Sequence, residues 1–289
     1  MNKHPILLII GGDFRQLEVI NILAPKLGTI YLVGFENISI SFDNVKKVSL
    51  EDVPFSILDF ILLPVPGIQD DGVVESKFSD EPIIFTKEIL NQTNEKCILY
   101  TGVITSYLQQ LTEELNREIV ALFARNEVAI SNSIPTAEGT LMLAIQHTNI
   151  TIHQSHVIVL GFGRVGMTVA RLFSNVGAYV RVYARKAEDI ARIAEMNMTP
   201  ISSSNLVQSL NESDIIINTV PSLILTASLI KEMPAHALII DLASKPGGTD
   251  FQAAKLHNIK TLWPLGLPAK VAPKTAGKII ANTLLQLIN

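Results

Sequence analysis

Three glycines spaced as Gly-x-Gly-x-x-Gly are the residues of this chain whose pattern most directly indicates chemistry. The apolar run at 157–160 predicts a buried strand before them, and the spacing at 164–176 predicts an amphipathic helix after them. In this order of strand, turn and helix, phosphates can approach the backbone and the free N–H groups of the first helical turn. The sequence therefore predicts a dinucleotide site formed by Gly161, Gly163, Arg164, Val165 and Gly166.

The end of the next predicted strand, at residues 179–183, bears on which nucleotide is bound. NAD enzymes usually place Asp or Glu there, and the carboxylate binds the ribose hydroxyls. This chain has Arg185 and Lys186 instead, and a guanidinium group matches the geometry of a 2′-phosphate. The sequence therefore favours NADP(H), with NAD(H) as the alternative, and a solvated strand end is the structural explanation of the same two cations.

Two later loops follow the predicted strands 214–218 and 238–241. Ligands of open α/β sheets bind beyond the carboxyl ends of the strands, so these loops should meet the nicotinamide. The cofactor contacts expected from them are Thr219, Pro221, Asp241 and Ala243.

Length and composition narrow the class of protein. The chain has 289 residues, of which 48% are hydrophobic and 17% charged, which is enough to build two sizeable cores. A net charge of -4 without a basic stripe argues against nucleic acid as a partner. The single cysteine excludes a disulfide within the chain and suits the cytoplasm. No apolar stretch is long enough for a membrane span, and we predict no metal site.

Alternating strand and helix patterns predict an α/β fold, with two doubly wound Rossmann-like domains and an interdomain cleft. Pro135 suits the first turn of a helix, and residues 128–130 resemble the last strand of the first domain. The expected parts are an N-terminal substrate-side α/β domain at 1–134, an interdomain helix at 135–150, an NAD(P)-binding Rossmann domain at 151–270 and a C-terminal helix at 271–289 that packs back on the first domain.

Polar residues at strand ends and helix starts are candidates for binding a substrate. Arg15 follows a glycine turn at the first strand, where it could pair with a carboxylate. Helix capping and ordinary solvation explain such residues equally well. The substrate-binding candidates are Arg15, Gln16, Thr101, Ser133, Thr136, Lys270 and Lys274.

Several motifs in order along the chain resemble one family. The glycine fingerprint and these further stretches resemble the A-subunit family of bacterial dipicolinate synthases: Gly11-Gly-Asp-x-Arg-Gln16, Asn132-Ser-Ile-Pro-Thr136 with Glu138-Gly-Thr140, Asp241-Leu-Ala-Ser244 with Pro246-Gly-Gly-Thr-Asp250, and Ala272-Pro-Lys-Thr-Ala-Gly277. The likeness spans nearly the whole chain, and the motifs show no break.

The resemblance implies an oxidoreductase of sporulating bacteria that acts in the mother-cell cytoplasm. Its substrate would be a small dicarboxylate, a dihydrodipicolinate-type intermediate of lysine synthesis that is oxidised to pyridine-2,6-dicarboxylate. It would work beside the flavoprotein-like B-subunit of dipicolinate synthase, and we expect a homo-oligomer.

Aromatising such a ring removes a hydride and a proton. The candidates for the base are Asp13, Glu138 and His147, and those for cations that hold the dianion are Arg15, Lys270 and Lys274. Two alternatives stay open. One is another NADP-linked dehydrogenase, acting on an amino acid, an imine or a folate-like substrate. The other is a nucleotide-sensing subunit without catalysis.

Overall fold

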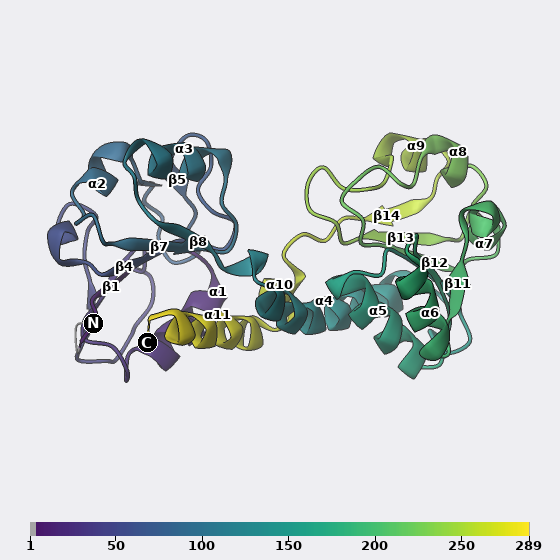
Figure 1. Ribbon diagram of the computed structural model, residues 1–289, viewed down its shortest axis with the longest axis horizontal. Coiled ribbons are helices and arrows are strands. Elements are labelled where there is room, and N and C mark those ends of the chain that lie inside the picture. The colour runs from purple at the N-terminus through teal and green to yellow at the C-terminus, as the bar shows by residue number, and fades with distance from the viewer. Residues whose placement is uncertain (1–3, 289) are drawn as a thin grey trace. The chain divides into compact units, whose positions relative to one another are not determined.

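The computed structural model describes residues 4–288, and the chain divides into two compact units (Figure 1). Unit 1 comprises the residues up to Ala129 together with those from Ala272 on, and unit 2 comprises Ile130–Val271. Each unit contains a six-stranded parallel sheet with helices packed on it. The predicted α/β fold with two doubly wound, Rossmann-like domains is confirmed.

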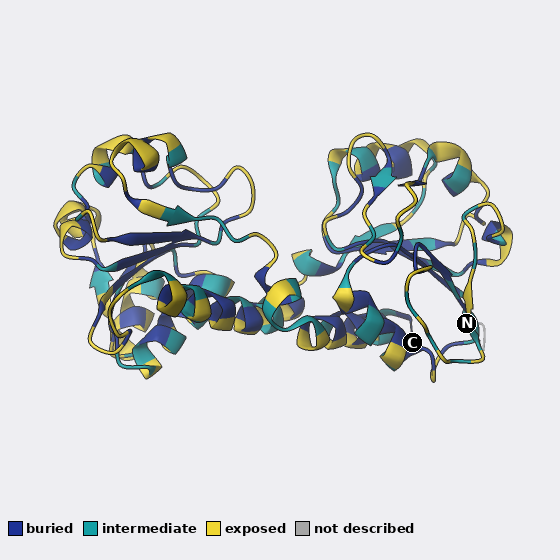
Figure 2. Cartoon of the chain, turned by 180° about the vertical axis from the view of Figure 1, so that it is seen from behind, coloured by how far each residue is buried: buried dark blue, intermediate teal, exposed yellow. Residues whose placement is uncertain are grey.

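The sheet of unit 1 has the strand order β3-β2-β1-β4-β7-β8. Its strands are β1 (Leu7–Ile10), β2 (Ile30–Val33), β3 (Val45–Lys47), β4 (Phe60–Leu62), β7 (Ile98–Thr101) and β8 (Ile119–Ala121). All residues of β1 are buried, because helices cover both faces of a parallel sheet and favour continuous β-branched and aliphatic runs (Figure 2). A short antiparallel pair, β5 (Val73–Val74) and β6 (Ile83–Ile84), lies outside this sheet.

The helices of unit 1 that follow its strands are α1 (Phe14–Leu23), α2 (Lys87–Asn91) and α3 (Ser106–Glu114), with short 3-10 turns at Phe55–Ile57 and Leu122–Ala124. The last helix of the chain, α11 (Pro273–Ile288), packs along α1 (Figure 1). A Cβ on Gly277 would lie 2.4 Å from the carbonyl oxygen of Arg15, so the two helices approach backbone to backbone. The apolar face of α11, with Ile280 and Leu284, completes the core beneath α1.

The sheet of unit 2 has the order β11-β10-β9-β12-β13-β14, the arrangement of a dinucleotide-binding domain. Its strands are β9 (His156–Leu160), β10 (Tyr179–Tyr183), β11 (Thr199–Ile201), β12 (Ile215–Asn218), β13 (Leu238–Asp241) and β14 (Lys260–Leu262). Its helices are α5 (Arg164–Asn175), α6 (Ala187–Glu195), α7 (Leu206–Asn211), α8 (Ala227–Ile230), α9 (Phe251–Leu256) and α10 (Leu267–Val271), with a 3-10 turn at Ser203–Asn205.

The long helix α4 (Asn126–His147) differs from the prediction in two respects. Residues 128–130 are helical, so the last strand of unit 1 is β8. Pro135 lies inside the helix and not at its first turn. Beside it, the hydroxyl of Ser133 donates to the carbonyl of Ile130 at 2.6 Å and that of Thr136 donates to the carbonyl of Asn132 at 2.9 Å. The helix predicted at 135–150 therefore begins at Asn126.

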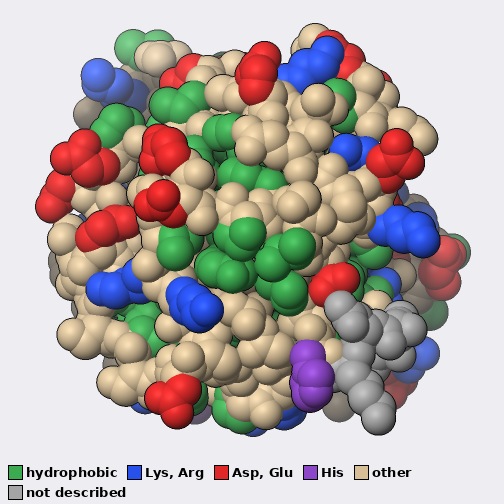
Figure 3. Space-filling view, turned by 90° about the vertical axis from the view of Figure 1, so that its left-hand side faces the viewer, with side chains coloured by type: hydrophobic (Ala, Val, Ile, Leu, Met, Phe, Trp, Pro, Cys, Tyr) green, Lys and Arg blue, Asp and Glu red, His purple; other side chains and the backbone are tan. Residues whose placement is uncertain are grey.

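Acidic and basic side chains are interspersed on the face drawn in Figure 3, and no continuous basic stripe crosses it. Among residues 4–288, no helix is both long and apolar enough to cross a bilayer. The same residues include no group of three His, Cys, Asp or Glu side chains placed to hold a metal ion.

Candidate functional site

The glycine turn after β9 leaves space where a pyrophosphate would bind. Gly161 has a φ of 92°, a conformation that favours glycine. A Cβ on Gly166 would lie 2.2 Å from the carbonyl oxygen of Gly161, so only glycine lets α5 begin against the turn. A Cβ on Gly163 would meet nothing within 4 Å. Within residues 4–288, no side-chain hydrogen bond caps the start of α5, and the amino end of a helix attracts an anion.

Thr219 and Pro221 follow β12 beside this turn. The hydroxyl of Thr219 donates to the carbonyl of Leu160 at 2.8 Å, and a Cβ on Gly161 would lie 2.7 Å from the same hydroxyl oxygen. Thr219 therefore braces the end of β9 against the end of β12. Pro221 is exposed at the tip of the loop, where a ligand can reach it.

Asp241 is fully buried and organises the loops after β12 and β13. One of its carboxylate oxygens accepts from the amide Nδ2 of Asn218 at 2.9 Å and from the backbone N–H of Ala243 at 3.0 Å. The other accepts from the N–H of Gly248 at 2.9 Å and from the hydroxyl of Thr249 at 2.7 Å. The expectation that Asp241 touches the cofactor is therefore corrected: its carboxylate is enclosed and holds the loops after β12 and β13 in place. Ala243 itself is also buried.

The end of β10 presents its two cations to solvent. Arg185 is exposed, and no residue in the described part of the chain forms a hydrogen bond or ion pair with it. Lys186 lies 3.9 Å from Glu188 with both side chains exposed, a contact that contributes little. The hydroxyl oxygen of Tyr183, the last residue of β10, is 3.2 Å from that of Ser203, which follows the adjacent strand β11. The carboxyl ends of these two strands therefore carry an exposed guanidinium group and two hydroxyls, groups that suit a phosphate monoester.

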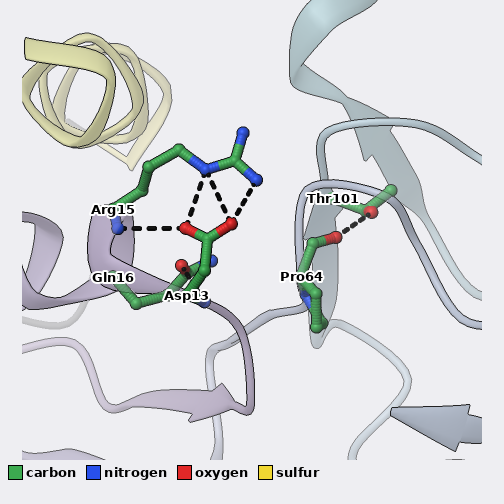
Figure 4. Close-up of polar contacts among 5 residues, drawn as sticks. All are labelled: Asp13, Arg15, Gln16, Pro64 and Thr101. Carbon is green, nitrogen blue, oxygen red and sulfur yellow. Dashed lines mark hydrogen bonds and ion pairs between the residues drawn. The ribbon is translucent and has the colours of Figure 1, made fainter. Parts of the chain in front are cut away.

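Unit 1 holds a fixed guanidinium group at the start of α1. Asp13 caps the helix, because its Oδ1 accepts from the backbone N–H of Arg15 at 3.0 Å. The same carboxylate accepts from Nε of Arg15 at 2.9 Å and from Nη2 at 2.7 Å. Figure 4 shows the remaining nitrogen, Nη1, directed away from Asp13. The pair sets the plane of the guanidinium group, which is 5% exposed, and leaves Nη1 outside the contact with Asp13.

The Arg15 pair determines the charge state of Asp13. Burial alone would raise the pKa of Asp13, but the hydrogen bonds and charge of Arg15, with the charge of Lys77, lower it below its ordinary value of 3.8. A carboxylate held ionised in this way is a weak proton acceptor. Asp13 is therefore better placed to orient Arg15 than to act as the predicted base.

This shift makes a prediction about stability. Because the pKa of Asp13 is depressed in the folded chain, its contribution is present above the ordinary value of 3.8 and is lost as pH falls through the depressed value. We expect Asp13→Asn to lower the free energy of unfolding at about pH 7 and to change it little at about pH 2. Urea unfolding at both values measures this. An equal loss at both would show that hydrogen-bond geometry, and not charge, carries the effect.

Lys77 is a candidate substrate-binding cation that the sequence analysis did not identify. The N–H of Gly12 donates to the carbonyl of Glu75 at 2.7 Å, and the N–H of Lys77 donates back to that of Gly12 at 2.8 Å. This pairing brings residues 75–77 against the glycine turn, and the charge of Lys77 lowers the pKa of Asp13. It also engages the N–H of Gly12, which is therefore not open to a phosphate.

Four predicted substrate contacts have structural roles in the fold. Gln16 is 1% exposed, and its side-chain oxygen accepts from the N–H of Asp13 at 2.9 Å. Thr101 is 0% exposed and donates to the carbonyl of Pro64 at 3.0 Å (Figure 4). Ser133 is 1% exposed and bonded to the hydroxyl of Thr168 at 2.7 Å. Their side chains are enclosed, so we correct these assignments. Thr136, described above, bonds within its own helix.

The remaining candidates are spread over both units. The carbonyl of His147 accepts from Lys260, the first residue of β14, at 3.1 Å. His147 therefore lies at the amino ends of the strands, away from the nicotinamide loops, and is not placed to act as the base. Glu138 is exposed on α4, and Lys270 is exposed on α10. Lys274 is exposed one turn before Gly277, the residue of α11 that contacts α1 near Arg15.

Comparison with known proteins decides the family. The chain is 46% identical over 280 residues to the dipicolinate synthase A-subunit of Bacillus subtilis (strain 168), a match that covers 97% of this chain and 94% of that protein. The chain belongs to the dipicolinate synthase A-subunit family. The model of the family's N-terminal domain matches residues 7–123. Residues 123–245 match the NAD binding domain of the D-isomer specific 2-hydroxyacid dehydrogenases.

Solved structures agree with this assignment. The crystal structure of the dipicolinate synthase A-subunit from Bacillus halodurans is 49% identical, has a TM-score of 0.96 and covers 98% of this chain and 97% of that one. The transhydrogenase from Sinorhizobium meliloti, at 12% identity and a TM-score of 0.70 over 98% of this chain and 94% of that one, shares the fold alone. The family and the NAD-binding domain together indicate an NAD(P)-dependent dehydrogenase.

Proposed function

We propose that this chain oxidises a dihydrodipicolinate-type dicarboxylate to pyridine-2,6-dicarboxylate, with NADP+ as the hydride acceptor. The observation that carries the proposal is that Asp13 fixes the guanidinium group of Arg15 in a chain of this family. A second cation, Lys77, is close enough for its charge to lower the pKa of Asp13. Two cations match a substrate with two carboxylates. The open glycine turn of unit 2 supports the cofactor part of the proposal.

Formation of the aromatic ring removes a hydride from one ring carbon and a proton from a neighbouring atom. The nicotinamide, when bound, supplies the hydride acceptor. Arg15 and Lys77 bind the carboxylates and fix the orientation of the ring, while Asp13 holds the guanidinium plane. Of the predicted bases, Glu138 remains our candidate for the proton acceptor, because its carboxylate is exposed. Lys270 and Lys274 remain candidates for attracting the dianion.

Lys77 provides a test of the two-cation arrangement. Its side chain is exposed, so its contribution to affinity is screened by solvent and smaller than that of the buried Arg15. We expect Lys77→Met to raise KM for the ring substrate by about tenfold and to leave kcat nearly unchanged. Steady-state kinetics measure both constants, and Lys96→Met, at an exposed site before β7, is the control. A fall in kcat at constant KM would contradict the assignment.

We further propose that Arg185, with Lys186, binds the 2′-phosphate of NADP(H). The guanidinium group of Arg185, which is exposed and has no partner among residues 4–288, follows the strand that ends at Tyr183, and this supports the choice over NAD(H). Arg185→Asp should weaken NADPH binding by about a hundredfold, because it replaces a cation by a carboxylate that repels the phosphate and suits a ribose diol. NADH binding should stay equal or tighten.

Trp263 offers the readout for this prediction. It is the single tryptophan of the chain, and its indole N–H donates to the carbonyl of Ala243 at 2.9 Å, in the loop after β13. Energy transfer from Trp263 to the reduced nicotinamide therefore reports binding without turnover. Arg192→Asp, on the exposed face of α6, is the matched control. Equal weakening of NADPH and NADH by Arg185→Asp would contradict the 2′-phosphate assignment.

The family resemblance supports the biological setting that we propose. The reaction would branch from lysine synthesis during sporulation, in the mother-cell cytoplasm. The partner would be the flavoprotein-like B-subunit of dipicolinate synthase, and the chain itself would form a homo-oligomer.

The direct test mixes the purified chain with fresh dihydrodipicolinate synthase product and NADP+ or NAD+, with and without the flavoprotein-like partner. Reduced nicotinamide and pyridine dicarboxylate are followed together by absorbance. We expect both to rise, faster with NADP+. Turnover of an amino acid or an imine without pyridine dicarboxylate would indicate another dehydrogenase. Cofactor binding with no reduction under any condition would indicate a nucleotide-sensing subunit.

A further inference from the structure

A short segment of unit 1, residues 75–78, crosses the glycine turn at the end of β1, and we call it the strap. The two hydrogen bonds with Gly12 described above tie it to this turn. A Cβ on Gly11 would lie 2.6 Å from the carbonyl oxygen of Glu75, so the two backbones are in direct contact. The strap therefore lies against the turn that leads into Asp13.

The hydroxyl of Ser76 fastens the strap to a second strand. It donates to the carbonyl of Gly34, the residue after β2, at 2.6 Å, and it accepts from the N–H of Phe78 at 3.1 Å. A serine oxygen that accepts from the N–H two residues later closes a small turn, and the middle residue of this turn is Lys77. One hydroxyl thus connects the end of β2 to the backbone around Lys77.

The two residues after Ser76 have opposite surroundings. Phe78 is 2% exposed, and its ring stacks on that of Phe35 with centroids 5.3 Å apart. Lys77 is exposed, and its charge is close enough to Asp13 to lower the pKa of that carboxyl. The strap is therefore anchored in the core while it presents a cation near the pair of Asp13 and Arg15.

A lysine on a fixed backbone has fewer positions open to its ammonium group, so less conformational entropy is lost when it binds a carboxylate. Building on the function proposed above, in which Lys77 binds a substrate carboxylate, we propose that Ser76 is a positioning residue of the substrate site. Its hydroxyl holds the turn that presents Lys77 to the substrate. Ser76 acts through Lys77 and does not itself contact the substrate.

The test compares Ser76→Ala, which removes the hydroxyl, with Ser76→Thr, which keeps it, in the full chain. Ser79→Ala is the matched control, because the hydroxyl of Ser79 closes a turn of the same kind: it donates to the carbonyl of Glu81 at 3.4 Å and accepts from the N–H of Glu81 at 3.2 Å. Lys77→Met gives the effect of removing the cation altogether. Urea unfolding checks that each variant is folded.

The pKa of Asp13 is the first readout, because it reports the position of Lys77 without substrate or turnover. NMR of isotopically labelled aspartate carboxyls measures it, and Asp13→Asn identifies the signal. Lys77→Met should raise this pKa, since a positive charge that lowers it is removed. We expect Ser76→Ala to raise it as well, and Ser76→Thr and Ser79→Ala to leave it unchanged.

Steady-state kinetics with the ring substrate are the second readout. We expect Ser76→Ala to raise KM by about fivefold with kcat nearly unchanged. Because Ser76 acts through Lys77, the double variant Ser76→Ala with Lys77→Met should raise KM by about tenfold, no more than Lys77→Met alone. Independent effects would multiply to about fiftyfold.

An unchanged pKa of Asp13 in Ser76→Ala would overturn the proposal, as would equal effects in Ser79→Ala or multiplied effects in the double variant. A loss in Ser76→Thr equal to that in Ser76→Ala would show that the hydroxyl is not the cause, and it would overturn the proposal too. If Lys77→Met raises the pKa of Asp13 but leaves KM unchanged, the substrate contact of Lys77 in the proposed function fails, and the inference fails with it.

Discussion

Arg15→Met is expected to lower kcat/KM for the ring substrate by about a thousandfold while leaving NADPH affinity unchanged. The variant removes the cation that binds a substrate carboxylate. It also leaves the carboxylate of Asp13, whose side chain is 19% exposed, without its partner and facing an anionic substrate. Both effects act in the same direction, so the loss exceeds that of one hydrogen bond. Steady-state kinetics and Trp263 energy transfer measure the two quantities.

The double variant Asp13→Asn with Arg15→Met separates these effects. Removing the unpaired carboxylate should recover about tenfold of the lost kcat/KM, because the repulsion disappears while the missing cation stays missing. Recovery to the starting activity would show that Arg15 serves only to neutralise Asp13. If kcat/KM of Arg15→Met alone stays within about tenfold of the unchanged chain, the substrate site that we propose in unit 1 is contradicted.

Gly163→Val is expected to weaken NADPH binding by about a hundredfold without lowering the stability of the chain. The φ of Gly163 is -79°, which other residues adopt, and a Cβ there meets nothing within 4 Å. The new side chain therefore fits the fold and fills only the space where phosphates approach the start of α5. Energy transfer from Trp263 gives the Kd, and urea unfolding gives the stability.

Gly166→Ala is the comparison that makes the result specific. Its Cβ would lie 2.2 Å from the carbonyl oxygen of Gly161, so the helix must shift, and both stability and NADPH binding should fall. NADPH affinity of Gly163→Val within about threefold of the unchanged chain would contradict the position that we assign to the pyrophosphate.

The parts of this chain that could be predicted from sequence are those with local signals. The glycine turn at 161–166 and the apolar strand before it need only their neighbours to form, and the structure places them as expected. Pro135 shows the limit of such rules. It favours a first helical turn, yet in the structure it lies inside α4, where the hydroxyls of Ser133 and Thr136 bond neighbouring carbonyls.

The candidate site was harder to predict, because side-chain direction depends on contacts distant in sequence. Lys77 approaches Asp13 only through the pairing of its segment with Gly12, which no local pattern indicates. Asp241 and Thr101 have polar side chains at the expected strand ends, yet both point inward to backbone or side-chain partners. A polar residue in a motif can hold a loop in place as readily as it can contact a ligand.

The carboxylate of Asp241 joins the loops after β12 and β13 in one network, and this has a consequence for local opening. The amides of Ala243 and Gly248 both donate to it, while Asn218 connects it to the N–H of Val220 at 3.0 Å. Breaking one of these bonds leaves buried polar groups unpaired at the others, so the two loops should open together. Hydrogen exchange should therefore give these three amides a common protection factor. The two loops in which we propose that the nicotinamide binds would then be exposed or protected in a single event.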